Sequence, residues 1–196
     1  MWNFFLFSKI FFYLCVIVTK GSKYIENFND VTEISHWSEQ SDTVQDVGKS
    51  KGSLVLQKTV NFQRAILFTL LNPQPCGAAF AGVQKQIPLD LSGFRSISLK
   101  VRGQGSFKGY KFILKEARYN YSFCNFFEAP DNFQEEILSL QDFKPYYEGK
   151  LVNDSGVSLD LSKITSIGIQ AYGGVYLPRK QSGVGSLEID WIRKNN

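Results

Sequence analysis

The sequence has very little histidine: His36 is the only one among 196 residues. Enzymes that use a Ser or Cys nucleophile need a nearby base, and that base is most often a histidine. His36 is the one residue available for this role, which excludes most histidine-based catalysis. The sequence therefore predicts a protein that is not an enzyme and that carries no cofactor.

A strong charge of one sign is also absent. Lys and Arg total 22 against 18 Asp and Glu, so the formal net charge is +4. Nucleic-acid binding usually needs a concentrated basic stripe, which this balance does not supply. Charged residues make up 20% of the chain and hydrophobic residues 43%, which excludes wholesale disorder.

No apolar run is long enough to span a membrane. Ile10–Val18 is uninterrupted but covers only nine residues, whereas a membrane-spanning helix needs about 20. Lys9 gives the run a positive flank, and Thr19 and Gly21 supply the small residues of a cleavage site. Residues 1–21 are therefore predicted to be a secretory signal peptide, and the mature protein to be secreted or lumenal without a membrane span. A mitochondrial presequence and an uncleaved anchor are the alternatives.

Cysteine is scarce as well, with Cys15, Cys76 and Cys124 as the only three. Cleavage of the signal peptide removes Cys15 and leaves an even pair in an oxidising compartment. A disulfide between Cys76 and Cys124 is the prediction, and two free thiols are the alternative. Asn120 and Asn153 begin N-glycosylation sequons, in agreement with the secretory route.

What the sequence does contain is a series of short runs of β-branched and aromatic residues. Ile97, Leu99 and Val101 alternate with polar residues, which is typical of a strand with one buried face. Leu187, Ile189 and Trp191 alternate in the same way. The predicted strands are Ser53–Thr59, Arg64–Leu71, Ala78–Gln84, Ser96–Arg102, Tyr110–Lys115, Tyr119–Phe123, Glu135–Ser139, Ser166–Ala171 and Ser186–Arg193.

So many strands cannot bury their apolar faces in one flat sheet. Residues 22–196 are therefore predicted to form a single all-β domain, a two-sheet jelly-roll sandwich. An internal similarity supports this, because Leu89–Leu99 and Leu159–Ile169 share a turn motif followed by an alternating strand. In each copy an Asp and a Ser are expected to bond to nearby backbone groups in the turn.

Six segments resemble a known family: Gly77–Val83, Leu89–Phe94, Ser96–Gly105, Tyr110–Phe112, Ser166–Ile169 and Leu187–Ile192. In this order and spacing they are similar to the complex I intermediate-associated protein 30 domain, over roughly residues 24–193. The resemblance implies a galactose-binding-like jelly roll, related to some carbohydrate-binding modules. It also implies a role without catalysis, since the best-known members are mitochondrial assembly factors that hold intermediates of respiratory complex I.

Two features depart from that family. The segment Asp42–Ser50 lacks one glycine of the family pattern and has gained a residue, which predicts a different loop shape. The second departure is the predicted secretory signal, because an exported protein cannot meet complex I intermediates in mitochondria. The resemblance therefore predicts the fold better than the cellular role.

Carboxylates and a loop are the candidate binding groups. Glu188 and Asp190 lie two residues apart on one strand face, and with Glu26 they could hold a structural calcium ion. Solvated surface carboxylates are the favoured interpretation. The long loop at residues 173–183 carries Tyr176, Arg179 and Lys180, and loops on a rigid sandwich often carry the binding residues.

Aromatic side chains are the other candidate binding groups. Alternation places Tyr119, Tyr121 and Phe123 on one face, which favours the core, with Asn120 facing outward. Phe126 and the pair at 146–147 could instead stack on sugar rings or anchor a protein partner.

These observations lead to three functional hypotheses. The first is a secreted, non-enzymatic module that binds or chaperones a protein partner. The second is a carbohydrate-binding, lectin-like module. The same fold and the many aromatic residues support it. The third is a mitochondrial complex I assembly factor, which would apply if the N-terminal segment were a presequence.

Overall fold

The computed structural model describes residues 21–44 and 46–196. The predicted signal peptide lies outside the described residues except for Gly21. One sheet contains β1 (Lys23–Asn27), β3 (Lys51–Lys58), β4 (Gln63–Leu71), β6 (Ser96–Gly105), β9 (Gln134–Ser139) and β13 (Gly183–Asn195). The other contains β2 (Trp37–Glu39), β5 (Phe80–Leu89), β7 (Gly109–Glu116), β8 (Ser122–Glu128), β10 (Lys144–Tyr147), β11 (Lys150–Leu151) and β12 (Ile164–Tyr172). Two short 3₁₀ helices, Asp42–Val44 and Leu140–Asp142, complete the elements.

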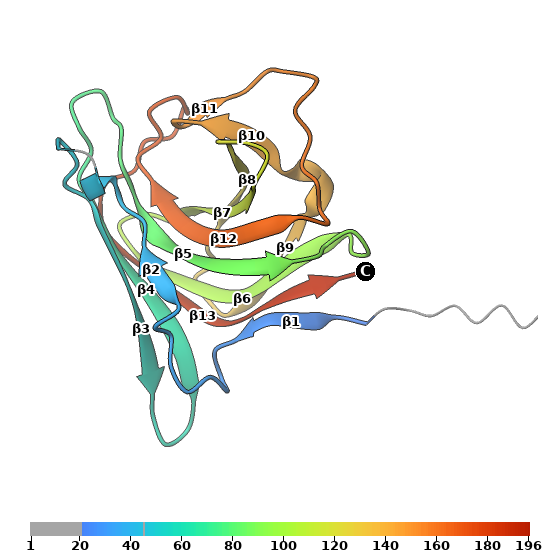
Figure 1. Ribbon diagram of the computed structural model, residues 1–196. Helices are drawn as coiled ribbons and strands as arrows, with labels where there is room; N and C mark the ends of the chain where they lie inside the picture. Colours follow the sequence, from blue (N-terminus) through green and yellow to red (C-terminus); the bar gives the residue numbers. More distant parts are fainter. Residues whose placement is uncertain (1–20, 45) are drawn as a thin grey trace, which may run out of the picture.

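The two sheets pack face to face, with β5 and β12 forming one layer above β6 and β13 (Figure 1). The six-stranded sheet has the order β3–β4–β13–β6–β9, with β1 added beside β13. The seven-stranded sheet has the order β11–β10–β8–β7–β12–β5–β2. The predicted all-β jelly-roll sandwich is therefore confirmed. Among the described residues no helix has the length and apolar character needed to cross a membrane.

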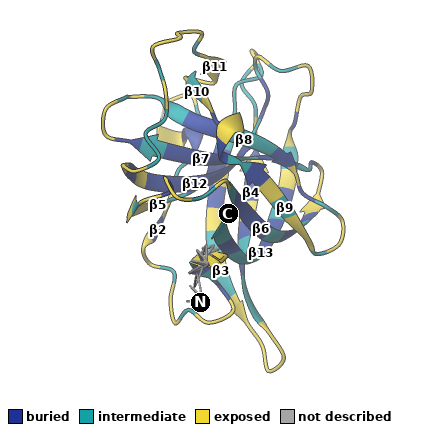
Figure 2. Cartoon of the chain, turned by 90° about the vertical axis from the view of Figure 1, so that its right-hand side faces the viewer, coloured by how far each residue is buried: buried dark blue, intermediate teal, exposed yellow. Residues whose placement is uncertain are grey.

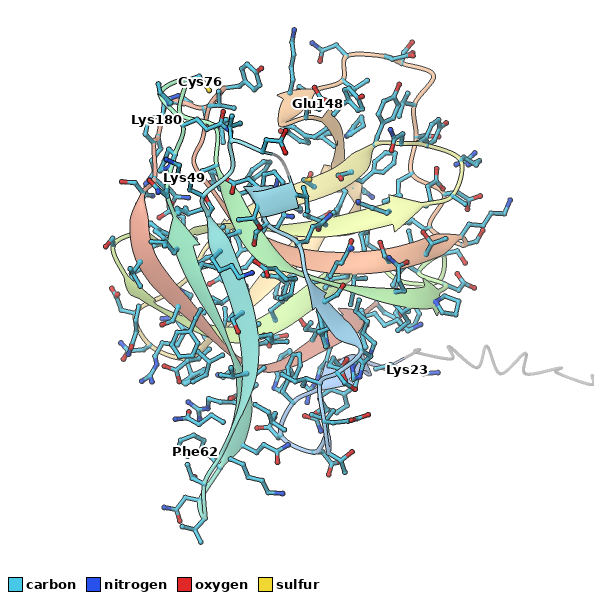
Figure 3. All side chains as sticks on the ribbon, turned by 60° about the vertical axis from the view of Figure 1, so that its left-hand side comes forward. Lys23, Lys49, Phe62, Cys76, Glu148 and Lys180 are labelled. Carbon is cyan, nitrogen blue, oxygen red and sulfur yellow. The ribbon has the colours of Figure 1, made fainter. Side chains whose placement is uncertain are left out.

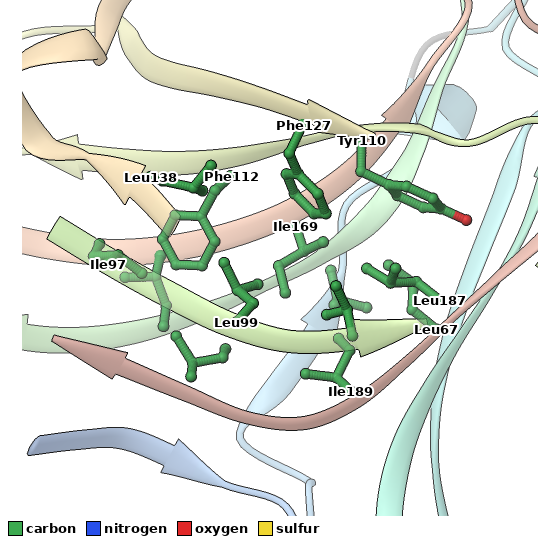
Figure 4. Close-up of a cluster of buried hydrophobic side chains, with 14 of the residues drawn as sticks. Leu67, Ile97, Leu99, Tyr110, Phe112, Phe127, Leu138, Ile169, Leu187 and Ile189 are labelled. Carbon is green, nitrogen blue, oxygen red and sulfur yellow. The ribbon is translucent and has the colours of Figure 1, made fainter. Parts of the chain in front are cut away.

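The core lies between the sheets, where the alternating apolar residues of both meet (Figure 4). Ile97 and Leu99 of β6 face Phe112 of β7 and Ile169 of β12 there, and each is at most 1% exposed. Burying one such side chain stabilises the fold by about 1.5–3 kcal/mol. Exposed residues concentrate in the loops that connect the strands (Figure 2).

Strand β13 departs from the predicted alternation. A bulge lies between Ile189, which pairs with Val101, and Trp191, which pairs with Lys100. The extra residue moves Ile192 into the core and turns Trp191 out of it. Trp191 contacts Arg193 instead, with the guanidinium 4.1 Å from the ring centre.

The predicted strand at residues 119–123 is wrong in its position, because β8 begins only at Ser122. Tyr119 and Tyr121 lie in the preceding turn, where their rings stack at 5.6 Å. Phe123 is buried in the core, as predicted, and Asn120 is exposed. Strands β2, β10 and β11 are too short to show a period of two, so the sequence does not reveal them.

The two similar turn motifs have the predicted conformation. Asp90 accepts hydrogen bonds from the backbone and hydroxyl of Ser92, at 2.8 and 2.7 Å. Asp160 accepts the same pair from Ser162, at 3.0 and 2.6 Å. The Leu91 amide donates to the carbonyl of Leu161 over 2.7 Å, so the two motifs lie side by side.

Candidate binding cavity

A cavity of about 420 Å³ lies on the face of the seven-stranded sheet that points away from the core. On β7, Lys111 and Ile113 line this cavity, while the residues between and beside them face the core. Register places Lys111 between Phe126 of β8 and Gln170 of β12. These three side chains form a row across the cavity floor. The sheet curls from β12 through β7 and β8 up to β10 and β11, and so partly surrounds this face (Figure 1).

Three aromatic side chains form one wall of the cavity. The ring of Phe126 meets that of Tyr146 edge-on at 5.4 Å and that of Tyr172 edge-on at 5.2 Å. Contacts of this geometry hold the rings in fixed orientations and contribute about 0.5–1.5 kcal/mol each. The wall is therefore a fixed apolar surface that is exposed within the cavity.

The rim consists of the turn between β10 and β11 and the loop at residues 173–182. Glu148 and Gly149 form the turn with positive φ angles of 48° and 79°, which a tight hairpin requires. In the loop, Gly174 has a φ of 84°, and a side chain there would collide with the carbonyl of Arg179. Glu148 and Lys180 lie at the same end of the molecule (Figure 3), where both rim segments meet.

Side-chain amides supply hydrogen-bonding groups in the cavity. Gln170 donates from Nε2 to the side-chain oxygen of Gln40 over 2.9 Å. Both residues line the cavity, and the contact orients the two amides. An amide offers a donor and an acceptor side by side, which suits a ligand with hydroxyl groups.

Lys111 and Cys124 are the titratable groups of the floor. Burial lowers the pKa of the Lys111 ammonium; Cys124 opposes this shift and Lys115 reinforces it. Burial also raises the pKa of the Cys124 thiol, which Lys111 and Lys115 partly offset. Burial therefore disfavours the charged form of both groups.

Of the three residues singled out in the predicted binding loop, only Tyr176 lines the cavity, beside Gly174, Val175 and Leu177 of the same loop. Tyr176 lines the rim and is 62% exposed. Arg179 instead pairs with Glu128. Lys180 donates to the carbonyl oxygens of Gly174 and Val175, at 2.7 and 3.1 Å, and so stabilises the loop itself.

The calcium site considered for Glu26, Glu188 and Asp190 is not formed, because these carboxylates bind cationic side chains. Glu26 pairs with Lys85 at 2.5 Å, and Glu188 pairs with Arg102 at 2.5 Å. Across residues 21–44 and 46–196 no cluster of three or more His, Cys, Asp or Glu residues could hold a metal ion.

The predicted disulfide is not present in the structure, where both cysteines are free thiols. Cys76 is exposed in the loop between β4 and β5, whereas Cys124 is buried on β8 at the cavity floor. The two thiols therefore lie in different environments, one exposed to solvent and one buried on the sheet. Asn120 and Asn153 are both exposed, and their glycosylation stays a prediction.

His36 lies beside a carboxylate. Its Nε2 lies 3.2 Å from the Glu26 carboxylate, which also accepts a hydrogen bond from Trp37. Residues 48–52 match the Gly-x-Ser-x-Gly pattern of serine hydrolases. Its Ser50 is fully buried, and the hydroxyl accepts a hydrogen bond from the Asn72 amide over 3.1 Å. It therefore does not form an exposed nucleophile.

Sequence reasoning missed Lys111, Gln170 and Tyr172. The signal that could have found Lys111 is the alternation in the predicted strand at 110–115, where lysines occupy the face opposite the core. Gln170 and Tyr172 gave no such signal, because only strand pairing brings β12 beside β7.

The fold is a two-sheet β-sandwich with a cavity on the outer face of its seven-stranded sheet. The family model for Complex I intermediate-associated protein 30 matches residues 26–189, and the chain therefore belongs to this family. No curated protein sequence matches the chain significantly.

Solved structures of carbohydrate-binding modules have a similar fold. The family 11 module from Clostridium thermocellum, in complex with a β-1,3-1,4-mixed-linked tetrasaccharide, has a TM-score of 0.67 at 16% identity, over 90% of this chain and 96% of the module. The family 11 module of a cellulosomal cellulase from the same organism has a TM-score of 0.66 at 14% identity. The match covers 90% of this chain and 95% of the module. An exo-β-agarase has a TM-score of 0.55 at 14% identity, over 90% of this chain and 25% of the agarase. At these identities the likeness establishes the fold.

Proposed function

We propose that this protein is a secreted, non-catalytic module that binds an oligosaccharide in the cavity of the seven-stranded sheet. The observation that carries the proposal is the aromatic wall of Phe126, Tyr146 and Tyr172 beside the amides of Gln40 and Gln170. A sugar ring has an apolar face that stacks on aromatic side chains and hydroxyl groups that bond to amides. One cavity offers both kinds of contact.

The size and the rim of the cavity support the same proposal. Its volume of about 420 Å³ lies within the range of about 300–1,000 Å³ that is typical of ligand pockets. Tyr176 extends the aromatic surface beyond the cavity, which suits a ligand made of several linked rings. The similarity in fold to a module solved with a tetrasaccharide also supports a glycan as the ligand.

A protein partner, the first hypothesis from the sequence, is the competing proposal. Family membership supports binding in general and does not favour a protein over a sugar. The aromatic and amide lining of the cavity favours the sugar.

Binding of the purified protein to a panel of immobilised glycans, followed by titration calorimetry, tests the proposal. Tyr146→Ala is expected to weaken sugar binding about tenfold or more, because it removes a stacking surface. Phe68→Ala is the matched control, since Phe68 is 47% exposed on the six-stranded sheet. Absence of any bound sugar, or binding that Tyr146→Ala leaves unchanged, would contradict the proposal.

Secretion is tested separately with the full chain carrying a C-terminal tag. The protein is expected in the culture medium, with an N-terminus that begins at Ser22 after cleavage of the signal peptide. Location of the tagged protein in mitochondria would support the assembly-factor hypothesis instead.

A further inference from the structure

Three lysines share the cavity face and have no acidic partner. Lys111 and Lys115 alternate with core residues along β7, and Lys144 of β10 lies opposite Cys124 of β8. Lys111 lines the cavity directly. In the part of the chain that the structure describes, none of the three ammonium groups forms an ion pair or donates a hydrogen bond.

The acidic groups near this face are engaged elsewhere or lie at the rim. The two carboxylate oxygens of Asp42 accept hydrogen bonds from the amides of Ser50 and Phe80, at 2.8 and 3.4 Å. Glu128 pairs with Arg179. Glu148 is exposed at the hairpin turn. Asp42 and Glu148 thus line the same cavity, but among the described residues neither forms an ion pair with Lys111, Lys115 or Lys144.

An unpaired ammonium in a partly buried site is unfavourable, because it loses water without gaining a counter-charge. Lys115 repels Lys111 and adds to that penalty. A carboxylate supplied by a ligand would remove it and form a charge-assisted hydrogen bond. Lys111 lies directly between Phe126 and Gln170, so a ring that stacks on the aromatic wall can place a substituent on the ammonium.

We propose that the ligand is an acidic oligosaccharide whose rings carry carboxylates, as in a chain of uronic acids. One carboxylate binds Lys111 at the cavity floor, and Lys115 and Lys144 attract the carboxylates of neighbouring rings. This inference rests on the proposed function and adds the class of sugar to it.

Titration of the full mature protein with matched acidic and neutral sugars tests the inference. The acidic probes are oligogalacturonate, oligomannuronate and hyaluronan oligosaccharides; the neutral probes are methyl-esterified oligogalacturonate and mixed-linkage β-glucan oligosaccharides. We expect an acidic probe to bind about tenfold or more tightly than the neutral ones, and its affinity to fall as salt is added.

The variant Lys111→Gln provides the second part of the test. It is expected to weaken binding of the acidic probe about tenfold or more and to leave the melting temperature at or above that of the wild type. Lys58→Gln is the matched control, because Lys58 is exposed on the six-stranded sheet and the charge change is the same. The control is expected to bind like the wild type.

The outcomes separate this inference from the proposed function. Tight binding of neutral sugars that Lys111→Gln leaves unchanged would overturn the acidic ligand and leave the sugar-binding function standing. No binding of either kind of sugar would overturn both. Equal losses in Lys111→Gln and Lys58→Gln would overturn the specific role of Lys111, because only net charge would then matter.

Discussion

The outer faces of the two sheets differ in whether their charged side chains form ion pairs. On the six-stranded sheet, Glu188 accepts from Arg64 at 2.8 Å and from Arg102 at 2.5 Å. Phe62 and Phe133 cover the Arg64 guanidinium, each with its ring centre at 4.2 Å. On the seven-stranded sheet, Lys111 has no carboxylate partner within the described residues. The same alternation of strand residues thus produces one outer face whose charges are paired within the protein and another whose lysine has no such partner.

Each face also has a hollow, but the two differ in what they offer. The hollow of the six-stranded sheet is lined by the paired Arg64, Arg102 and Glu188. A ligand there would have to displace these ion pairs, which is costly when the partners are partly buried. The cavity of the seven-stranded sheet is lined by aromatic rings and by Lys111, which forms no ion pair among the described residues, so a ligand there would break no ion pair of the floor.

The largest expected effect comes from breaking the paired face. Glu188→Ala leaves two partly buried guanidinium groups without their main counter-charge, so the free energy of unfolding is expected to fall by about 3 kcal/mol. Urea denaturation measures the change. Glu33→Ala is the control, because Glu33 is exposed, and its effect is expected within about 0.5 kcal/mol. A loss no larger than that of the control would show that the paired face contributes nothing.

A smaller effect of opposite sign is expected on the unpaired face. Lys111→Gln removes a charge that burial disfavours, so the free energy of unfolding is expected to rise by about 1 kcal/mol at neutral pH. Urea denaturation of the wild type and of Lys111→Gln measures this change, with Lys58→Gln as the control. A marked destabilisation would mean that Lys111 supports the fold, and the contrast between the faces would then fail.

The gain from Lys111→Gln is expected to depend on pH. The pKa of Lys111 is lowered in the folded protein, so its penalty is fully present below that lowered pKa. As pH rises through the folded pKa toward the ordinary value of 10.5, the folded protein releases the proton first and the wild type gains stability. The difference in unfolding free energy between wild type and Lys111→Gln should therefore shrink at alkaline pH. A constant difference would assign the gain to packing.

The smallest effect is on thiol chemistry and leaves stability unchanged. Cys76 is exposed and is expected to react with an alkylating reagent first. Cys124 is expected to react more slowly, because burial raises the pKa of its thiol and shields it. Bound ligand should slow Cys124 further, since Cys124 lines the cavity. Mass spectrometry of the labelled peptides measures both rates, and a pair that labels only after reduction would instead indicate the disulfide.

Much of the fold follows from local patterns. The alternation of Ile97, Leu99 and Val101 predicts both the strand and its buried face, because strand side chains point to opposite sides in turn. The turns at Asp90 and Asp160 are equally local, since each carboxylate bonds to a residue two positions on. The bulge in β13 was not predicted, because it depends on how that strand pairs with β6.

The candidate site was much less predictable. In the loop predicted to bind, Tyr176 lines the cavity, whereas Arg179 pairs with Glu128 and Lys180 stabilises the loop itself. The calcium ligands considered, Glu188 and Asp190, bind arginine instead. Sequence shows which residues carry charge or aromatic surface, but not which of them find an internal partner.

By itself the sequence determined the strand pattern and the turn chemistry, because both depend on residues that are close together in the chain. It also determined the family, through the order and spacing of short segments along the whole domain. Only the tertiary structure decided that Lys111, Phe126 and Gln170 form one row, and that Glu188 neutralises Arg64 from the far end of the chain. Both results come from strand order and register. These join residues distant in sequence, and they decide which charges are paired within the protein and which are not.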